Sequence, residues 1–355
     1  MKSSLDSTQP DWMDRPERGS PHLLSLMGWL SRRCGRRFGR VLLLPIAAWF
    51  WTRTPLARAD SARYLSRVYG RPAGARDTFA HYHHFAQTIL DRMFLLADRR
   101  ELFEVQVIGR EYLLDHLDKG KGVFMVGAHM GSFEALRVMA RDHACGRVSM
   151  AMYEGNARKI GAWLRSLDPT LEEMIVPLGR VDSMLQIQAR LNRGDMVGFL
   201  ADRSFGHDPV VMAPFLGDPA PFPTGIFRMA AVLRCPVVVM AGLYVGGNRY
   251  QLHFAPLADF SQIGRSARAR AVEEAVFRFA ATLETFCRIA PLNWFNFFDF
   301  WSTGRKPLAL ATNPERSTLT ERDPLTAQSG ASQAAGQARA STQDPGESRG
   351  QHASA

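Results

Sequence analysis

A histidine and a glutamate stand close together in the stretch VGAHMGSFEA, residues 126–135, and both side chains can move protons. Four residues separate His129 from Glu134. The apolar run before His129 is typical of a strand, and Ser132 suits the N-cap of a following helix. His129 would then lie at a strand end, where α/β sheets build their sites, and Glu134 in a first helical turn.

This arrangement allows two interpretations. Glu134 can turn back and accept a proton from one nitrogen of His129, which fixes the tautomer and leaves the other nitrogen as a general base. Such a base activates a substrate hydroxyl without an enzyme nucleophile. Alternatively, the ring nitrogens of His129 form hydrogen bonds with backbone groups, and Glu134 does no more than cap the helix. The spacing by itself favours neither interpretation.

Three more polar residues are candidates for binding a substrate. Asp202 and Arg203 follow the apolar strand pattern of residues 196–201, and a guanidinium group can hold a phosphate or a carboxylate in bidentate fashion. The alternative for Arg203 is an ordinary ion pair with Asp202 or Asp208. Arg228 lies just inside a predicted helix after Thr224, where a helix N-terminus can also bind an anion.

Alternating strand and helix patterns predict the scaffold for these residues. Apolar runs rich in β-branched residues predict strands at 122–128, 196–201 and 235–244, and the alternating run 250–257 predicts a strand nearer a sheet edge. Helical patterns cover 184–192, 224–233 and 272–289, and a longer helical region extends over 56–100. The alternation predicts an α/β fold, with a sheet covered by helices.

The N-terminal part of this region combines arginines with an apolar run. Five arginines between positions 32 and 40 precede the apolar residues 41–51, which are too few for a spanning helix. Basic flanks and tryptophans at the end predict a helix that lies in or dips into a membrane interface. A buried core helix with a basic edge and a cleaved signal peptide are the alternatives.

Composition limits the other classes of function. The 355 residues are 46% hydrophobic and carry a net charge of +10, which is compatible with nucleic acid, an anionic membrane or an acidic substrate. The densest basic cluster adjoins an apolar segment, which favours anionic lipid over nucleic acid. The four widely spaced cysteines are expected to be buried, reduced thiols, and His81, His83 and His84 have no ligand partners at metal-binding spacing. We therefore expect no metal.

Several blocks resemble one enzyme family. HMGSFE matches the H-x-x-x-x-[DE] motif of the lysophospholipid acyltransferase superfamily, and the surrounding chain is similar to the late acyltransferases of lipid A biosynthesis. The blocks GFLADRS, APFLGDPAPFPTGIFRMAAVLRCPVVVMAGL and PLNWFNFFDFW agree with that branch, and so does the basic-apolar start. The resemblance extends over residues 29–301. Ala128 and Arg203 depart from the asparagine and glutamine usual at these positions, which leaves the acceptor open.

The resemblance implies a function and a set of roles. His129 is the base that activates an acceptor hydroxyl and Glu134 is its orienting partner. The donor is a thioester of acyl carrier protein or coenzyme A, no cofactor is needed, and the acceptor is a lipid A-like or other glycolipid. Arg158 and Arg165 are competing candidates for a substrate-binding arginine. The fold is a mostly parallel sheet covered by helices, as in glycerolipid acyltransferases, with N-terminal helices at the cytoplasmic face of the inner membrane.

The expected organisation has four parts. Residues 1–22 and 313–355 are polar and predicted to be disordered, 23–55 to be the membrane-anchoring segment, and 56–305 to be the acyltransferase domain. A lipid esterase or thioesterase that uses the same two residues is the enzymatic alternative, although the sequence has no G-x-S-x-G elbow. A non-catalytic basic membrane-binding protein is the alternative from another class.

Overall fold

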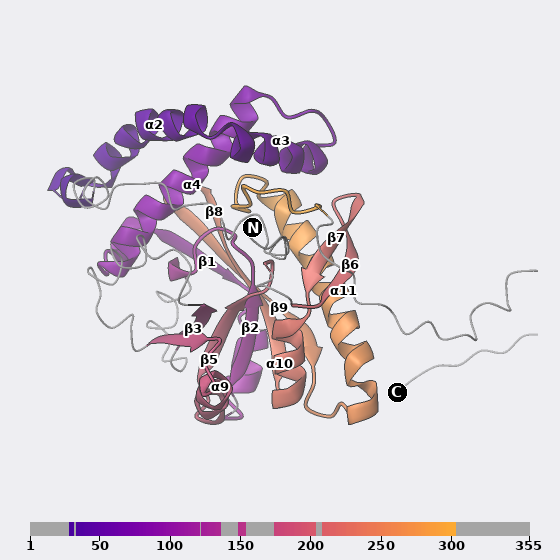
Figure 1. Cartoon of the computed structure of the whole chain (residues 1–355). Helices are drawn as coiled ribbons and strands as arrows, with labels where there is room; N and C mark the ends of the chain where they lie inside the picture. The colour runs from indigo at the N-terminus through magenta and orange to yellow at the C-terminus, as the bar shows by residue number, and fades with distance from the viewer. Residues whose placement is uncertain are drawn as a thin grey trace, which may run out of the picture. The chain divides into compact units, whose positions relative to one another are not determined.

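A central β-sheet with helices on both faces forms the frame of the molecule (Figure 1). The computed structural model describes residues 28–31, 33–120, 122–135, 148–153, 174–203 and 208–302. They belong to the compact unit Met1–Leu308, and a second unit, Ala309–Ala355, lies outside the described residues. The terminal segments predicted to be disordered, 1–22 and 313–355, also lie outside them.

In the described part of the chain, seven strands form the main sheet in the order β1-β9-β8-β2-β5-β3-β4. Every neighbouring pair in this sheet is parallel except β8 and β9, which are antiparallel. The strands are β1 (Glu104–Ile108), β2 (Val123–Gly127), β3 (Val148–Tyr153), β4 (Ile175–Leu178), β5 (Met196–Leu200), β8 (Pro236–Gly246) and β9 (Arg249–Asp259). The predicted α/β class with a mostly parallel sheet is confirmed.

Two groups of helices cover the two faces. The cluster on one face joins the sheet to α3 (Pro55–Tyr69), α9 (Ser183–Asn192), α10 (Gly225–Leu233) and α11 (Arg268–Ile289). The cluster on the other face joins it to α2 (Arg36–Arg53), α4 (Ala75–Leu96) and α5 (Glu111–Leu117). Short 3-10 turns, η1 (Arg100–Leu102) and η2 (Arg265–Ala267), precede β1 and α11.

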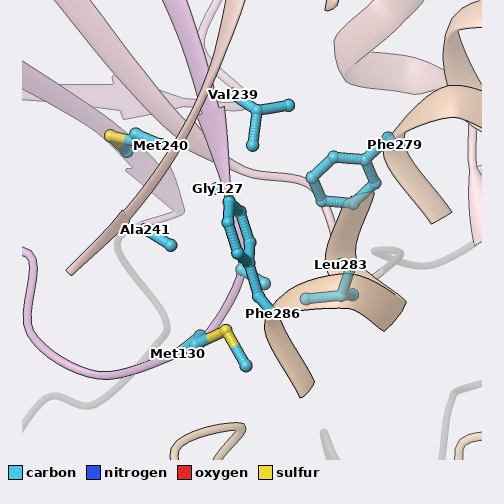
Figure 2. A pocket seen from close by; sticks show the side chains of 9 residues that line it. Gly127, Met130, Val239, Met240, Ala241, Phe279, Leu283 and Phe286 are labelled. Carbon is cyan, nitrogen blue, oxygen red and sulfur yellow. The ribbon is translucent and has the colours of Figure 1, made fainter. Parts of the chain in front are cut away.

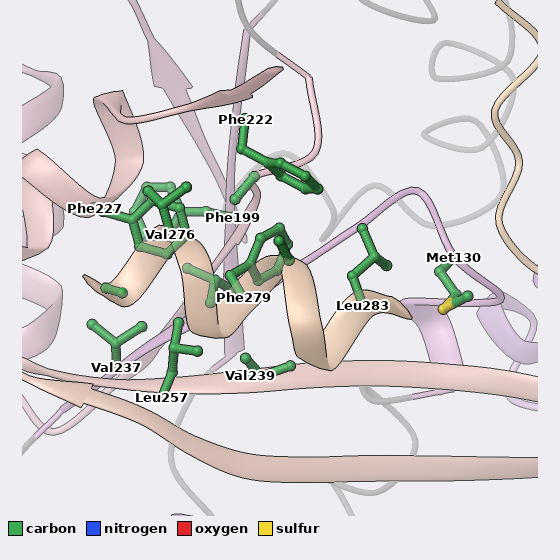
Figure 3. Close-up of a cluster of buried hydrophobic side chains, with 14 of the residues drawn as sticks. Met130, Phe199, Phe222, Phe227, Val237, Val239, Leu257, Val276, Phe279 and Leu283 are labelled. Carbon is green, nitrogen blue, oxygen red and sulfur yellow. The ribbon is translucent and has the colours of Figure 1, made fainter. Parts of the chain in front are cut away.

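Successive side chains of β2 point to opposite faces of the sheet, so this short strand contributes to both hydrophobic clusters. Phe124 and Val126 belong to the cluster under α11, whereas Val123 and Met125 belong to the cluster under α4. Figure 3 shows the first of these layers, where Val276, Phe279 and Leu283 of α11 pack towards the sheet. Because both faces are covered, the strand reads as a continuous apolar run, which is why the sequence predicts it well.

A two-stranded hairpin, β6 (Val210–Phe215) and β7 (Asp218–Pro223), lies outside the main sheet. Phe215 and Phe222 from this hairpin are fully buried in the same cluster as α11. The aromatic segment 290–302 packs beside them, since Trp301 stacks on Phe215 with ring centroids 5.7 Å apart. Aromatic side chains of the hairpin and of the segment 290–302 thus form one cluster, called the aromatic cluster below.

Helix α2 contains the apolar run 41–51 of the predicted membrane-anchoring segment. Its inner face is fixed to the domain by Asp91 of α4, which is fully buried and bonds to Arg36 at 2.7 Å and Arg40 at 2.9 Å. None of the helices in the described ranges combines the length and the apolar character needed to cross a bilayer. The prediction of N-terminal helices is confirmed, and their membrane association stays a prediction.

The cysteine prediction needs one correction. Cys34, Cys235 and Cys287 are free thiols, and the last two are buried. Cys34, which was expected to be buried, is exposed near the start of the described N-terminal helical segment, and Cys145 lies outside the described residues.

Candidate active site

Parallel pairing of β2 with β5 brings His129 to Asp202. Gly127 and Leu200 are register partners at the ends of these strands, so the loops that follow leave the sheet side by side. The Nδ1 atom of His129 lies 2.8 Å from Oδ1 of Asp202, and the backbone N–H of His129 donates to Oδ2 at 3.0 Å. The side chain of Asp202 is 1% exposed and that of His129 is 28% exposed.

The loop that carries His129 is held by close backbone approach. Gly131 has a φ of 60° and forms a bridge with Gly242 of β8. A Cβ atom on Gly131 would lie 1.8 Å from the carbonyl oxygen of Gly242, so only glycine fits this position. The N–H of Ser132 then donates to the same carbonyl at 2.8 Å.

Residues 290–302, the last segment that the structure describes, contact the loops of His129 and Asp202. The N–H of Phe295 donates to the carbonyl of His129 at 2.8 Å, and Met130 forms an antiparallel bridge with Trp294. The indole N–H of Trp294 donates to Oδ2 of Asp202 at 3.0 Å. Both oxygens of the carboxylate are therefore engaged, and its orientation is fixed.

Glu134 lies at the start of a helix, as expected, but its described partners are Arg92 and Ser132 instead of His129. Its Oε1 atom pairs with Nη2 of Arg92 on α4 at 2.5 Å, and its Oε2 atom accepts from the hydroxyl of Ser132 at 3.1 Å. Glu134 was expected to bond to one nitrogen of His129, and in the structure Asp202 makes such a bond, at Nδ1. The reason is topological, because the strand order sets β5 next to β2.

Charges around His129 favour its neutral form. Burial lowers the pKa of the His129 imidazole, and the positive charges of Arg203 and Arg92 lower it further against the opposing effect of Asp202. Burial raises the pKa of Asp202, but His129 and Arg203 outweigh it, and the net pKa lies below the ordinary value. An ionised carboxylate only accepts, so Nδ1 of His129 carries the proton and Nε2 keeps its lone pair.

The predicted substrate-binding residues have different surroundings. Arg203 lies beside the pair, where Nη2 donates to the carbonyl of Phe295 at 3.0 Å and the guanidinium lies 5.3 Å from the Phe298 ring centre. Arg228 is exposed on α10, and no contact within the described ranges joins it to His129 or Asp202. Arg158 and Arg165 lie outside the described residues.

A small apolar pocket adjoins the His129 loop (Figure 2). Its lining comes from the end of β2 and the start of the loop, from β8 and from α11: Gly127, Ala128, Met130, Val239, Met240, Ala241, Phe279, Leu283 and Phe286. Ala128 and Met130 flank His129 directly in the sequence. The loop that carries His129 thus also supplies two residues of the apolar pocket lining.

Sequence reasoning found His129, Asp202 and Arg203 but missed two contributors. Arg92 lay within an expected helix and showed no motif, while Trp294 was noticed only as part of an aromatic ending. No described cluster of three or more histidine, cysteine or acidic side chains is arranged to hold a metal ion. The described site combines a histidine, the carboxylate that is hydrogen-bonded to it and two neighbouring cations.

Comparison with known proteins gives one finding. The sequence profile of the family described as bacterial lipid A biosynthesis acyltransferase matches residues 24–303. No curated protein matches the chain. The match extends over every described strand and over the His129 and Asp202 loops. The chain belongs to the bacterial lipid A biosynthesis acyltransferase family and is an acyltransferase.

Proposed function

We propose that the protein transfers a fatty acyl group from a thioester of acyl carrier protein or coenzyme A to a hydroxyl group of a lipid A-like or other glycolipid acceptor. Family membership supports an acyltransferase that acts on a lipid-like acceptor. The observation that carries the proposed mechanism is the hydrogen bond of 2.8 Å between Nδ1 of His129 and Asp202. It leaves Nε2 of His129 as the proton acceptor.

In the proposed step, Nε2 of His129 removes the proton of the acceptor hydroxyl while the hydroxyl oxygen attacks the thioester carbonyl carbon. A carbon–oxygen bond forms, and the carbonyl electrons move onto the oxygen. When this tetrahedral intermediate collapses, the carbon–sulfur bond breaks and the imidazolium returns its proton to the departing thiolate. The products are an ester and a free thiol, and no enzyme nucleophile is needed.

The oxyanion of the intermediate needs positive charge nearby. Arg203 and Arg92 both lie close enough to His129 to lower its pKa, so their fields act at the reacting centre. Glu134 holds Arg92 through the contact of 2.5 Å and acts in this scheme as the anchor of that cation. The motif glutamate then contributes through Arg92, while Asp202 orients the base.

The acceptor and the acyl chain are lipophilic, and the surroundings of His129 suit them. The pocket beside the loop is lined by apolar residues only (Figure 2). Such a surface excludes water from the thioester carbonyl, which favours transfer over hydrolysis.

Membrane association forms part of the proposal, and the outer face of α2 supports it. Val41 is 64% exposed, Leu44 45% and Trp49 56%, and helical spacing sets them on one face. Arg37 and Arg53, near the two ends of this face, are exposed, and no acidic residue occurs between positions 28 and 59. An apolar stripe with cationic ends fits an anionic membrane interface.

The proposed location is the cytoplasmic face of the inner membrane, where the protein would meet both a lipid acceptor and acyl thioesters from the cytoplasm. Purified protein in lipid nanodiscs, supplied with radiolabelled acyl–acyl carrier protein or acyl-coenzyme A and extracted inner-membrane lipid, tests the function. We expect a lipid that gains one acyl chain by mass spectrometry with wild type and none with His129→Ala. Release of free fatty acid alone, with acceptor present, would show a thioesterase and contradict the proposal.

A further inference from the structure

Trp294 is fully buried at the point where the last described segment meets the catalytic loop. Its indole N–H and the two donors of His129 together engage both oxygens of Asp202. Of these three donors, the indole N–H is the one that belongs to the segment 290–302. It lies 92 residues beyond Asp202 and adds a contact that neither the β2 loop nor the β5 loop supplies.

The backbone around Trp294 is itself fixed. The carbonyl of Trp294 accepts from Nε2 of His81 on α4 at 3.0 Å, and Nδ1 of His81 then accepts from the hydroxyl of Ser61 on α3 at 2.8 Å. His81 is fully buried, and burial lowers its pKa to about 3, so it stays neutral. The preceding Asn293 exchanges two side-chain bonds with the backbone of Tyr244, at 2.7 and 2.9 Å.

Aromatic packing fixes the indole ring as well. The ring centroid of Trp294 lies 5.0 Å from that of Tyr64, 5.2 Å from that of Phe215 and 4.9 Å from that of Phe300. These three rings enclose the indole and hold its N–H group towards Asp202. Packing alone would be satisfied by any large aromatic ring, whereas the bond to Asp202 needs the nitrogen.

We propose that Trp294 is a positioning residue of the acyl transfer, whose indole N–H fixes the carboxylate of Asp202 and thereby sets the orientation and basicity of His129. The inference rests on the proposed function. Besides burial, the pKa of His129 is lowered by Arg203 after β5, raised by Asp202 and lowered by Arg92 on α4, and the pKa of Asp202 is lowered by His129 and Arg203.

Trp294→Phe tests the inference, because it removes the N–H and keeps an aromatic ring. Trp301→Phe is the matched control. The indole of Trp301 lies in the same aromatic cluster, but its N–H donates to the carbonyl of Phe215 at 3.3 Å and not to Asp202. We expect kcat of Trp294→Phe to fall roughly tenfold to hundredfold with KM little changed, and kcat of Trp301→Phe to stay within about threefold of wild type.

The pH profile separates positioning from packing. Without the indole donor the negative charge of Asp202 is less neutralised and binds the imidazolium form of His129 more tightly. The acidic limb of kcat should therefore move to higher pH in Trp294→Phe and stay in place in Trp301→Phe. Equal losses in both variants with an unshifted limb, or wild-type behaviour of Trp294→Phe, would overturn the inference.

Two further measurements keep the inference testable. Replacement of the Trp294 indole by a benzothiophene side chain preserves the shape without the N–H, in case Trp294→Phe does not fold. NMR titration of labelled histidine, with His129 assigned by substitution, measures the same pKa without turnover. If wild type transfers no acyl group, the proposed function fails, and an unchanged His129 titration in the benzothiophene protein separately refutes the link to Trp294.

Discussion

At the scale of residues, the two carboxylates near His129 have different tasks. Asp202 bonds to the imidazole, and Glu134 bonds to Arg92. Asp202→Asn should lower kcat about 10²- to 10⁴-fold, as should His129→Ala, because both disable the general base. Glu134→Gln keeps the shape and one acceptor oxygen, so its loss should be smaller. Steady-state kinetics rank the three, and a larger loss in Glu134→Gln than in Asp202→Asn would return the orienting role to Glu134.

The pH dependence of kcat follows from the same charges. The base acts when neutral, and burial with Arg203 and Arg92 lowers its pKa. Activity should therefore persist to lower pH than an ordinary histidine of pKa about 6.5 allows. Because Asp202 acts to raise that pKa, Asp202→Asn should move the acidic limb of its residual activity to still lower pH. Profiles from pH 4.5 to 8 check both signs, and a limb above about pH 6.5 in wild type would contradict them.

At the scale of elements, α2 has an inner and an outer face with separate roles. Val41 on the outer face is 64% exposed, and Val232 on α10 is 54% exposed, so the two form a matched pair for substitution. Val41→Glu should weaken binding to phosphatidylglycerol vesicles about tenfold or more, since it removes apolar contact and adds negative charge. Val232→Glu should bind like wild type in a vesicle flotation assay. Equal effects of both changes would mean that α2 is not the contact surface.

The inner face of α2 depends on one buried carboxylate. Asp91 accepts from Arg36, Arg40 and the hydroxyl of Tyr250, and it is fully buried. Asp91→Asn should lower the free energy of unfolding by about 3–5 kcal/mol, because it leaves two guanidinium groups without their counter-charge. Asp218→Asn, which breaks the more exposed pair with Arg67, should cost at most about 1 kcal/mol. Denaturant unfolding measures the stability of both variants. Similar losses of stability would contradict the prediction that Asp91 holds α2 on the domain.

Which elements the sequence could predict depends on their burial. β2, β5 and β8 are covered on both faces and read as continuous apolar runs, so they were found. β1 alternates between exposed and half-buried residues at a sheet edge and gave no such signal. Asp202 was predicted as a substrate-binding residue, and its contact with His129 was missed for another reason. β3 and β4 come between β2 and β5 in the chain but lie outside β5 in the sheet, and local patterns do not encode that order.

At the scale of the whole molecule, the net charge of +10 adds a long-range attraction to anionic lipid. Binding to phosphatidylglycerol vesicles should weaken when NaCl rises from about 50 to about 500 mM, because the Debye length falls from ~14 to ~4 Å. Binding to uncharged phosphatidylcholine vesicles should be weaker and nearly independent of salt. Salt-insensitive binding to both kinds of vesicle would show that apolar contact alone holds the protein on lipid.

The contacts of Trp294 and Phe295 with the loops of His129 and Asp202 also determine when this site can form during translation. A ribosome makes α2 first and residues 290–302 near the end of the described chain. A nascent chain can therefore present its N-terminal helix before the carbonyl of His129 and the carboxylate of Asp202 have received their last hydrogen bonds. On the proposed mechanism, acyl transfer requires that residues 290–302 have been synthesised, because a premature stop before Trp294 removes the hydrogen bonds that this segment donates to His129 and Asp202.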